Sequence, residues 1–186
     1  MSPTEYICQE TLITPEVLAP LVERLFEQKH YKKYQTLQKA GSNEGRLYYV
    51  EQGLLRTFYE KKKKDITQSF FIEQMFYFPV ENIYFDSPTP IQLEALEDCV
   101  VWEADFREVE RVVNEHQELE RLMRLLLVSA IQTLREQLYT IKFQSAQERY
   151  ELLLKKYPQI LLRAPLGHIA SLLGITQQTL SVIRKN

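Results

Sequence analysis

Polar side chains that could read nucleic-acid bases gather between positions 176 and 182. Ala170 and, four residues later, Gly174 precede them, and this spacing is typical of two helices that cross closely after a tight turn. Apolar residues that would lock the two helices together are Ile169, Leu173, Ile175, Leu180 and Ile183. The segment Leu166–Lys185 therefore predicts a helix-turn-helix, and a purely structural helical hairpin with a glycine in its turn is the alternative.

The second helix of this segment carries the expected base contacts. Thr176 is predicted to cap it, and the residues expected to face outward near its start are Thr176, Gln177, Gln178, Thr179, Ser181 and Val182. Glutamine can pair with adenine through two hydrogen bonds and valine can touch a thymine methyl, which favours A·T-rich sites. Arg184, Lys185 and His168 are candidates for phosphate contacts. With so few charged contacts, we expect weak binding with a shallow salt dependence.

A long helix, predicted from about residue 117 to 141, must position this motif. Its apolar residues step by 4, 3, 4 and 3 positions through Leu127, Ile131, Leu134, Leu138 and Ile141, which is a heptad seam. We interpret the seam as a homodimer interface, because a two-fold dimer with one recognition helix per subunit suits a palindromic duplex site. Burial of the seam against the chain's own β region is the alternative. After the long helix, Ser145 and Glu148 have the spacing of a capping box and predict a further helix to about Lys155.

Before the long helix, the pattern changes from helical to strand-like. A helix that begins at Thr14 and Pro15 and runs to about Phe26 comes first, followed by a polar stretch and a turn at 40–45. Strands are predicted at 47–50, 54–59, 66–72, 91–96 and 99–104, and a short helix at 107–114. Such short strands with regular turns predict an antiparallel roll or barrel. Lys61–Lys64 is interpreted as a solvated hairpin tip, with a contact to DNA or RNA polymerase as the alternative.

The composition is that of a globular protein, with 45% hydrophobic and 26% charged residues. The net charge of −2 hides an asymmetry: residues 1–139 hold 16 Lys and Arg against 23 Asp and Glu, whereas residues 140–186 hold 7 against 2. A basic C-terminal part on an acidic body is the electrostatic pattern of a DNA-binding segment. We expect no membrane span and no signal peptide, and two isolated thiols, Cys8 and Cys99, favour the reducing cytoplasm.

The residue types that could form a catalytic or metal site do not occur at the spacings that such sites need. His30, His116 and His168 are scattered without the spacing of a metal site. The sequence also lacks a glycine-rich phosphate loop and a nucleophile elbow. We therefore expect no enzyme activity, no metal and no cofactor.

Several segments of the sequence resemble the cyclic-AMP receptor protein (Crp/Fnr) family of bacterial transcription regulators. Residues 48–56 (YYVEQGLLR) and 94–99 (EALEDC) are similar to roll strands of that family, and residues 145–150 (SAQERY) and 169–176 (IASLLGIT) to the start of its DNA-binding domain. The resemblance covers nearly the whole chain and is most specific over about the last 40 residues. It implies a β-roll, a dimerisation helix and a helix-turn-helix, in that order.

The chain departs from the family at the cyclic-nucleotide site. Members that bind the nucleotide hold its phosphate with a Gly-Glu pair and an Arg followed by Ser or Thr. The corresponding regions here are Phe78–Asn82 and Pro90–Leu93, and no arginine lies between Arg56 and Arg107. Because a buried phosphate without donors is costly, we expect no cyclic nucleotide. Met75 with the aromatic residues at 76–78 and 84–85 could line an apolar ligand pocket, or these aromatics could simply fill the core.

Together these observations predict an α+β protein with a jelly-roll type β-roll, a long helix and a winged-helix/helix-turn-helix domain. The expected domains are residues 1–114, 115–141 and 142–186. The expected function is a homodimeric transcription regulator that binds double-stranded DNA, contacts RNA polymerase and responds to an unknown small-molecule effector. The alternative is a sensing or interaction module whose helix-turn-helix has lost DNA binding.

Overall fold

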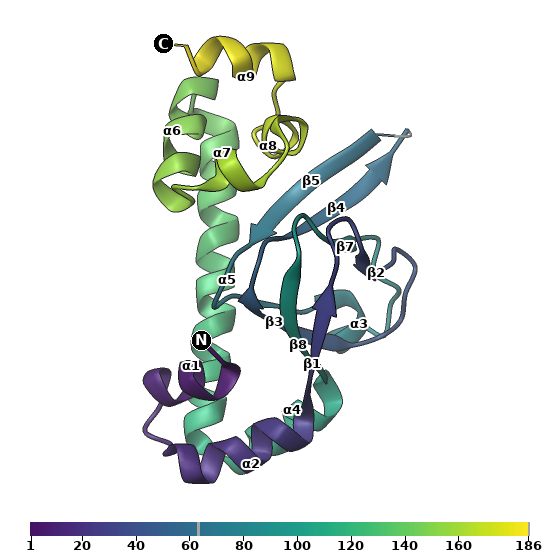
Figure 1. The fold of residues 1–186 in the computed structure, drawn as a ribbon, viewed down its shortest axis with the longest axis vertical. Helices are drawn as coiled ribbons and strands as arrows, with labels where there is room; N and C mark the ends of the chain where they lie inside the picture. Colours follow the sequence, from purple (N-terminus) through teal and green to yellow (C-terminus); the bar gives the residue numbers. More distant parts are fainter. Residues whose placement is uncertain (63, 186) are drawn as a thin grey trace. The chain divides into compact units, whose positions relative to one another are not determined.

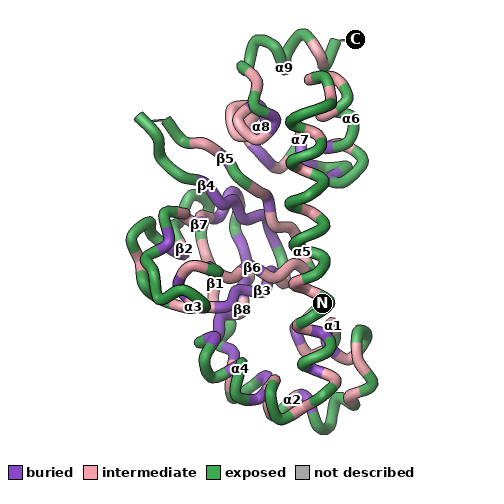
Figure 2. The backbone as a smooth tube through the Cα atoms, turned by 180° about the vertical axis from the view of Figure 1, so that it is seen from behind, coloured by how far each residue is buried: buried purple, intermediate pink, exposed green. Residues whose placement is uncertain are grey.

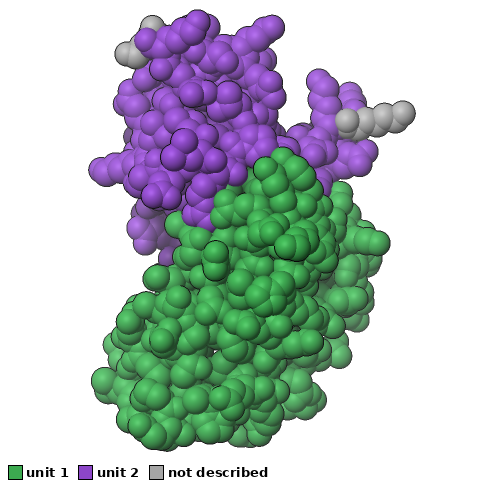
Figure 3. Space-filling view, in the orientation of Figure 1, with its two compact units in different colours: residues 1–57, 70–126 green, residues 58–69, 127–186 purple. Residues whose placement is uncertain are grey.

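The computed structural model describes residues 1–62 and 64–185 (Figure 1). Its contacts divide the chain into two compact units, which Figure 3 colours separately. Unit 1 consists of residues 1–57 and 70–126, and unit 2 of residues 58–69 and 127–186, of which 63 and 186 lie outside the described residues. One long helix and one β-hairpin therefore contribute residues to both units.

Two four-stranded sheets form the β region. The first has the order β1 (Phe26–Tyr31), β8 (Cys99–Asp105), β3 (Arg46–Gln52), β6 (Phe76–Tyr77), and the second the order β2 (Thr36–Gln38), β7 (Gln92–Ala95), β4 (Leu55–Lys61), β5 (Lys64–Phe71). β8 is antiparallel to both of its neighbours, so that Trp102 lies opposite Gln28 and Tyr49. The turn before β4 needs Gly53, whose φ is +106° and where a Cβ would come within 2.4 Å of Cys99 Sγ.

The remaining elements of unit 1 are helical: α1 (Pro3–Glu10), α2 (Pro15–Leu25), α3 (Val80–Tyr84), α4 (Phe106–Glu115) and the first part of α5 (Gln117–Phe143). One buried cluster, which includes Val50, Leu93 and Val101, fills the inside of the roll. A second cluster, which includes Leu18 and Leu122, joins the helices to the first sheet. Figure 2 shows both as buried segments of the tube.

Unit 2 contains residues 127–143 of α5, the hairpin residues 58–69, and the helices α6 (Ala146–Lys156), α7 (Ile160–Arg163), α8 (Leu166–Leu172) and α9 (Gln177–Ile183). Ile160, Ile169 and Leu180 are its most deeply buried side chains. Ser145 and Glu148 form the expected capping box at the start of α6, and the hydrogen bonds from Ser145 lower the pKa of the Glu148 carboxyl.

Most elements predicted from the sequence are present, within a few residues at their ends. Two were missed. α1 begins with a capping box between Ser2 and Glu5 and has Pro3 at its first helical position. Both features are present in the sequence and could have predicted this helix. β1 has no alternating apolar pattern, because its side chains after Phe26 are exposed or half-buried, and it is held by its ladder with β8. Phe26 therefore begins a strand and does not end α2.

The wing of the expected winged-helix domain is absent from the described residues. No strand follows β8 in the described chain, and residues 146–183 contain four helices joined by short connections. A wing needs a pair of strands with period-2 patterning, whereas the apolar residues of this segment repeat at helical spacing. Separately, no described helix is both long enough and apolar enough to cross a membrane.

Candidate nucleic-acid interface

The turn between α8 and α9 is closed by two backbone hydrogen bonds. The N–H of Ile175 donates to the carbonyl of Ala170 (3.0 Å), and the N–H of Gly174 donates to the carbonyl of Ser171 (3.1 Å). This pair of bonds is a Schellman motif, which requires a left-handed residue after the helix. Gly174 has φ +67° and meets that requirement. The expected glycine turn is therefore present, and Ala170 is buried as its small size suggested.

α9 begins as predicted. The hydroxyl of Thr176 accepts a hydrogen bond from the N–H of Thr179 at 3.1 Å, which caps the helix. Leu180 is completely buried and fixes the inner face of the helix. The side chains of Gln177, Gln178, Thr179, Ser181 and Val182 are exposed. α9 thus presents amide, hydroxyl and methyl groups, which can form hydrogen bonds and apolar contacts with base edges.

Arg149 connects α6 to this motif. Its Nε donates to the carbonyl of Leu173 (3.1 Å), and its Nη1 donates to the carbonyl of Gln144 (2.9 Å). The first bond satisfies a carbonyl at the C-terminus of α8, where a cation is favoured. The sequence analysis did not assign Arg149 a role. The one indication was that Arg149 lies in the segment 145–150, which resembles the start of the family's DNA-binding domain.

The three phosphate candidates do not lie on one element. Arg184 and Lys185 are exposed at the C-terminal end of α9, and the N–H of Arg184 donates to the carbonyl of Leu180. His168 is half-buried in the first turn of α8. Arg184 and Lys185 are therefore free to reach a solvent-side ligand, whereas His168 is partly covered.

A second set of cations was not expected at this site. Lys61, Lys62 and Lys64 from the β4–β5 hairpin line a hollow of about 440 Å³ whose other wall includes Gly167 and Gln177. All of these residues belong to unit 2. Lys63, the remaining member of the predicted hairpin tip, lies outside the described residues. The run of lysines was visible in the sequence, but its nearness to α8 and α9 was not.

The predicted heptad seam lies on the part of α5 that belongs to unit 2. Ile131, Leu134, Leu138 and Ile141 are between 55% and 69% exposed, and Leu127 is half-buried. Figure 2 shows this stretch of the helix without buried segments. The structure therefore leaves a row of large apolar side chains uncovered, which is unusual for a protein surface in water.

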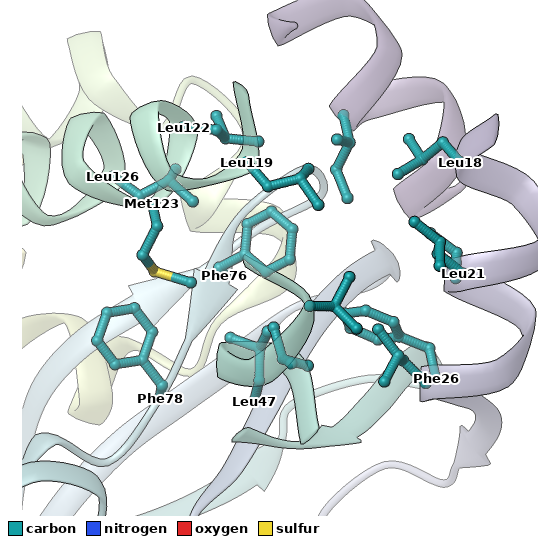
Figure 4. A pocket seen from close by; sticks show the side chains of 15 residues that line it. Leu18, Leu21, Phe26, Leu47, Phe76, Phe78, Leu119, Leu122, Met123 and Leu126 are labelled. Atoms are coloured by element: carbon teal, nitrogen blue, oxygen red, sulfur yellow. The ribbon is translucent and has the colours of Figure 1, made fainter. Parts of the chain in front are cut away.

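Unit 1 contains an apolar cavity of about 60 Å³ (Figure 4). Leu18, Phe76, Phe78, Leu122 and Met123 are among its lining side chains, all of which are apolar. Of the aromatic residues suggested for a ligand pocket, Phe76 and Phe78 line the cavity, whereas Tyr77 is buried in the roll and Phe85 is exposed. Ordinary ligand sites have volumes of about 300–1,000 Å³, so this cavity is too small for a nucleotide.

The neighbouring strands β4 and β7 carry an ion pair between a buried arginine and a half-buried glutamate. Arg56, which is 1% exposed, contacts Glu94 at 2.5 Å between Nη2 and Oε1. The positive charge of this arginine is therefore balanced by a carboxylate of the chain itself. The described residues contain no group of three or more His, Cys, Asp or Glu side chains that could hold a metal ion.

Comparisons with known proteins agree with this architecture. The family model of the cyclic nucleotide-binding domain matches residues 28–116. No curated protein sequence matches the chain. Among solved structures, the chain is similar to a double mutant of CooA from Carboxydothermus hydrogenoformans, with a TM-score of 0.71 and 21% identity over 91% of this chain and 81% of the other.

Two further structures show the same fold. FixK2 from Bradyrhizobium japonicum has a TM-score of 0.75 and 15% identity, over 87% of this chain and 83% of FixK2. A candidate Crp/Fnr-family transcriptional regulator from Eubacterium rectale has a TM-score of 0.71 and 15% identity, over 91% of this chain and 81% of the other. The chain therefore combines a match to the cyclic nucleotide-binding domain at residues 28–116 with the fold seen in regulators of the Crp/Fnr type.

Proposed function

We propose that the protein is a DNA-binding transcription regulator that reads an inverted-repeat site as a homodimer. The observation that carries the proposal is the α8–turn–α9 motif, with its Schellman turn, its buried Leu180 and its exposed polar face. The charge distribution supports it. Unit 2 holds 12 Lys and Arg against 5 Asp and Glu, whereas unit 1 holds 11 against 20. The basic unit is the one that contains the motif, as DNA binding requires.

The exposed seam of α5 supports the homodimer. Pairing Leu127, Ile131, Leu134, Leu138 and Ile141 with the same residues of a second copy would remove a continuous apolar row from water. Val128 and Phe143, which are 55% and 70% exposed, would extend the same contact. A two-fold axis along this seam would give the dimer two copies of α9, as an inverted repeat requires.

The roll of this regulator is proposed to sense something other than a cyclic nucleotide. The regions that correspond to the family's phosphate-binding residues, Phe78–Asn82 and Pro90–Leu93, contain no arginine, so a buried phosphate would lack its donors. The proposed functional division is residues 1–114 for the sensor, 115–141 for dimerisation and 142–186 for DNA. An effector would act by shifting the equilibrium between arrangements of the two units. In this proposal the protein works in the cytoplasm with RNA polymerase, and it is not an enzyme.

Selection from a pool of randomised DNA duplexes tests the proposal. Purified protein at low salt is expected to enrich an inverted repeat with A·T-rich half-sites. The double variant Gln177→Ala/Gln178→Ala should lose the enrichment, whereas the control Gln117→Ala/Gln132→Ala, which removes two exposed glutamines from α5, should keep it. The proposal would fail if the unmodified protein enriched no inverted repeat at low salt.

The second candidate is a sensing or interaction module without DNA binding. The motivating observation is that α9 exposes no cation before Arg184 and presents Gln177, Gln178 and Val182 instead. A chromosomal Arg184→Ala/Lys185→Ala strain separates the two candidates. Changed transcript levels in that strain support the regulator, and transcripts identical to those of the parent strain support the interaction module.

A further inference from the structure

The side chain of Ser171 links the helix-turn-helix to the β4–β5 hairpin. The hydroxyl of Ser171 in α8 accepts a hydrogen bond from the backbone N–H of Thr67 in β5 (3.0 Å) and donates one to the carbonyl of Asp65 (3.3 Å). Thr67 is buried at this contact. A serine that satisfies both a donor and an acceptor of one strand holds that strand at a defined place beside α8.

This attachment brings three lysines to the recognition helix. Lys61, Lys62 and Lys64 are exposed, and together with Gln177, the first residue of α9, they line the hollow of about 440 Å³. The other lining residues are Asp65, Ile66, Gly167, Ala170, Ser171 and Ile175, so that one carboxylate stands against three ammonium groups. One face of unit 2 therefore offers a polar base-reading side chain and several ammonium groups around the same concave surface.

A ligand of this surface must be negatively charged, and it must lie next to the groups that α9 contacts. The hairpin residues 58–69 contain four lysines against Glu60 and Asp65, so their net charge is positive. An ammonium group is a point charge that binds phosphate oxygens without a demand for planar geometry. In a DNA duplex, phosphates border the groove whose base edges a recognition helix contacts.

We infer that the β4–β5 hairpin is a second DNA-contacting element, in which Lys61, Lys62 and Lys64 hold the phosphate backbone next to the base step contacted by Gln177. This inference rests on the proposed function and deepens it. The hairpin contributes positive charge that α9 itself lacks before Arg184.

The salt dependence of binding provides the first test. Binding of a mixed-sequence duplex is measured by fluorescence anisotropy over a range of salt concentrations, for the unmodified protein and for Lys61→Gln/Lys62→Gln/Lys64→Gln. Each lost phosphate contact makes the slope of log K against log salt shallower by about 1. We therefore expect a slope shallower by about 3 in the triple variant, with at least a roughly tenfold loss of affinity at low salt.

A control variant that loses the same charge elsewhere distinguishes direct phosphate contacts of the hairpin lysines from the general attraction between a positively charged protein and DNA. Lys33→Gln/Lys39→Gln/Arg107→Gln removes three exposed cations from unit 1 and should leave the slope within about 1 of the original. Circular dichroism and the melting temperature show that both variants fold. If the hairpin variant and the control change the slope equally, the lysines act only through the overall field and the inference is overturned.

A positional measurement completes the test. A hydroxyl-radical-generating iron chelate is attached to Lys62→Cys, with the labelled parent protein as control for Cys8 and Cys99. Cleavage of a selected inverted repeat at the flank of each half-site is the expected result. If the protein binds the repeat but cleavage at the flanks is absent, the hairpin faces another partner, such as a protein, and the inference fails while the proposed function stands. If the unmodified protein binds no duplex, both fail.

Discussion

The side chain of Gln177 lies against Gly167. A Cβ at position 167 would come within 2.4 Å of Gln177 Nε2, so glycine is what allows this side chain of α9 to rest on α8. The φ of Gly167 is not in the left-handed region, and its role is therefore to leave space. The amide of Gln177 is thereby held on the surface that also carries the hairpin lysines.

We expect Gly167→Ala to change DNA recognition while the protein remains folded. The added methyl group must displace the flexible end of Gln177, whereas alanine is favoured over glycine in a helix by at most about 1 kcal/mol. The melting temperature should stay equal or rise, and the preference for the selected half-site should fall. Competition between the selected and a scrambled duplex measures this preference. A background of Gln177→Ala is the matched control, and in it Gly167→Ala should have no further effect.

Leu134→Asp is expected to break the proposed dimer. Leu134 is 59% exposed in the single chain, so the substitution leaves the subunit folded, but in a dimer it would place an unpaired carboxylate in the seam. A penalty of about 3 kcal/mol corresponds to a dissociation constant about 100-fold higher. Sedimentation velocity over a concentration series measures it. Ser129→Asp adds the same charge to an exposed position outside the seam and should leave the dimer intact. An unchanged dimer in Leu134→Asp would contradict the heptad assignment.

The ion pair between Arg56 and Glu94 should be sensitive to the loss of one partner. Glu94→Leu removes the carboxylate that contacts the buried guanidinium in the second sheet, and we expect the free energy of unfolding to fall by about 3 kcal/mol. The double variant Arg56→Met/Glu94→Leu should recover most of this loss, because an apolar pair of similar size needs no charge partner. Urea denaturation measures both. Equal stability of the single and double variants would show that the pairing of charge does not govern this site.

Tyr77 should make the roll sensitive to alkaline pH. Burial raises the pKa of its phenol from 10.0 to about 12, partly offset by the hydrogen bond that Gln38 Nε2 donates to its hydroxyl at 3.2 Å. Below pH 10 the phenol is neutral in both states, and its contribution to stability is complete. Between pH 10 and 12 the unfolded chain ionises first, so the free energy of unfolding falls as the pH rises.

The variant Tyr77→Phe tests this assignment. At pH 8 it should be about 1 kcal/mol less stable, because Gln38 Nε2 loses the shorter of its two hydrogen bonds and keeps the one to the carbonyl of Ile91. Its stability should then decline less steeply than that of the parent protein between pH 10 and 12, as followed by urea denaturation at each pH. A parallel decline in the two proteins would mean that Tyr77 is not the group that titrates. Tyr59→Phe, at a position that is 38% exposed, is the control and should not alter the decline.

Local signals in the sequence were sufficient where a short stretch of chain determines its own conformation. The capping box of Ser145 and Glu148, the cap of Thr176 and the turn at Gly174 depend on atoms within about one helical turn, and all three were predicted correctly. The heptad spacing likewise identified the apolar row on α5 from sequence alone. The capping box at Ser2 shows that α1 could have been found by the same reasoning.

Other features depend on residues that are far apart in the chain. β1 exists because its backbone pairs with β8, and its own side chains do not indicate a strand. Arg56 meets Glu94 through the order of strands in the second sheet, and Ser171 meets Thr67 across more than 100 residues. The sequence showed that residues 61–64 form a positively charged run, but a charge does not determine which part of the protein lies beside it. Only the tertiary structure placed it beside Gln177, because such contacts are set by sheet pairing and packing, which local sequence does not encode.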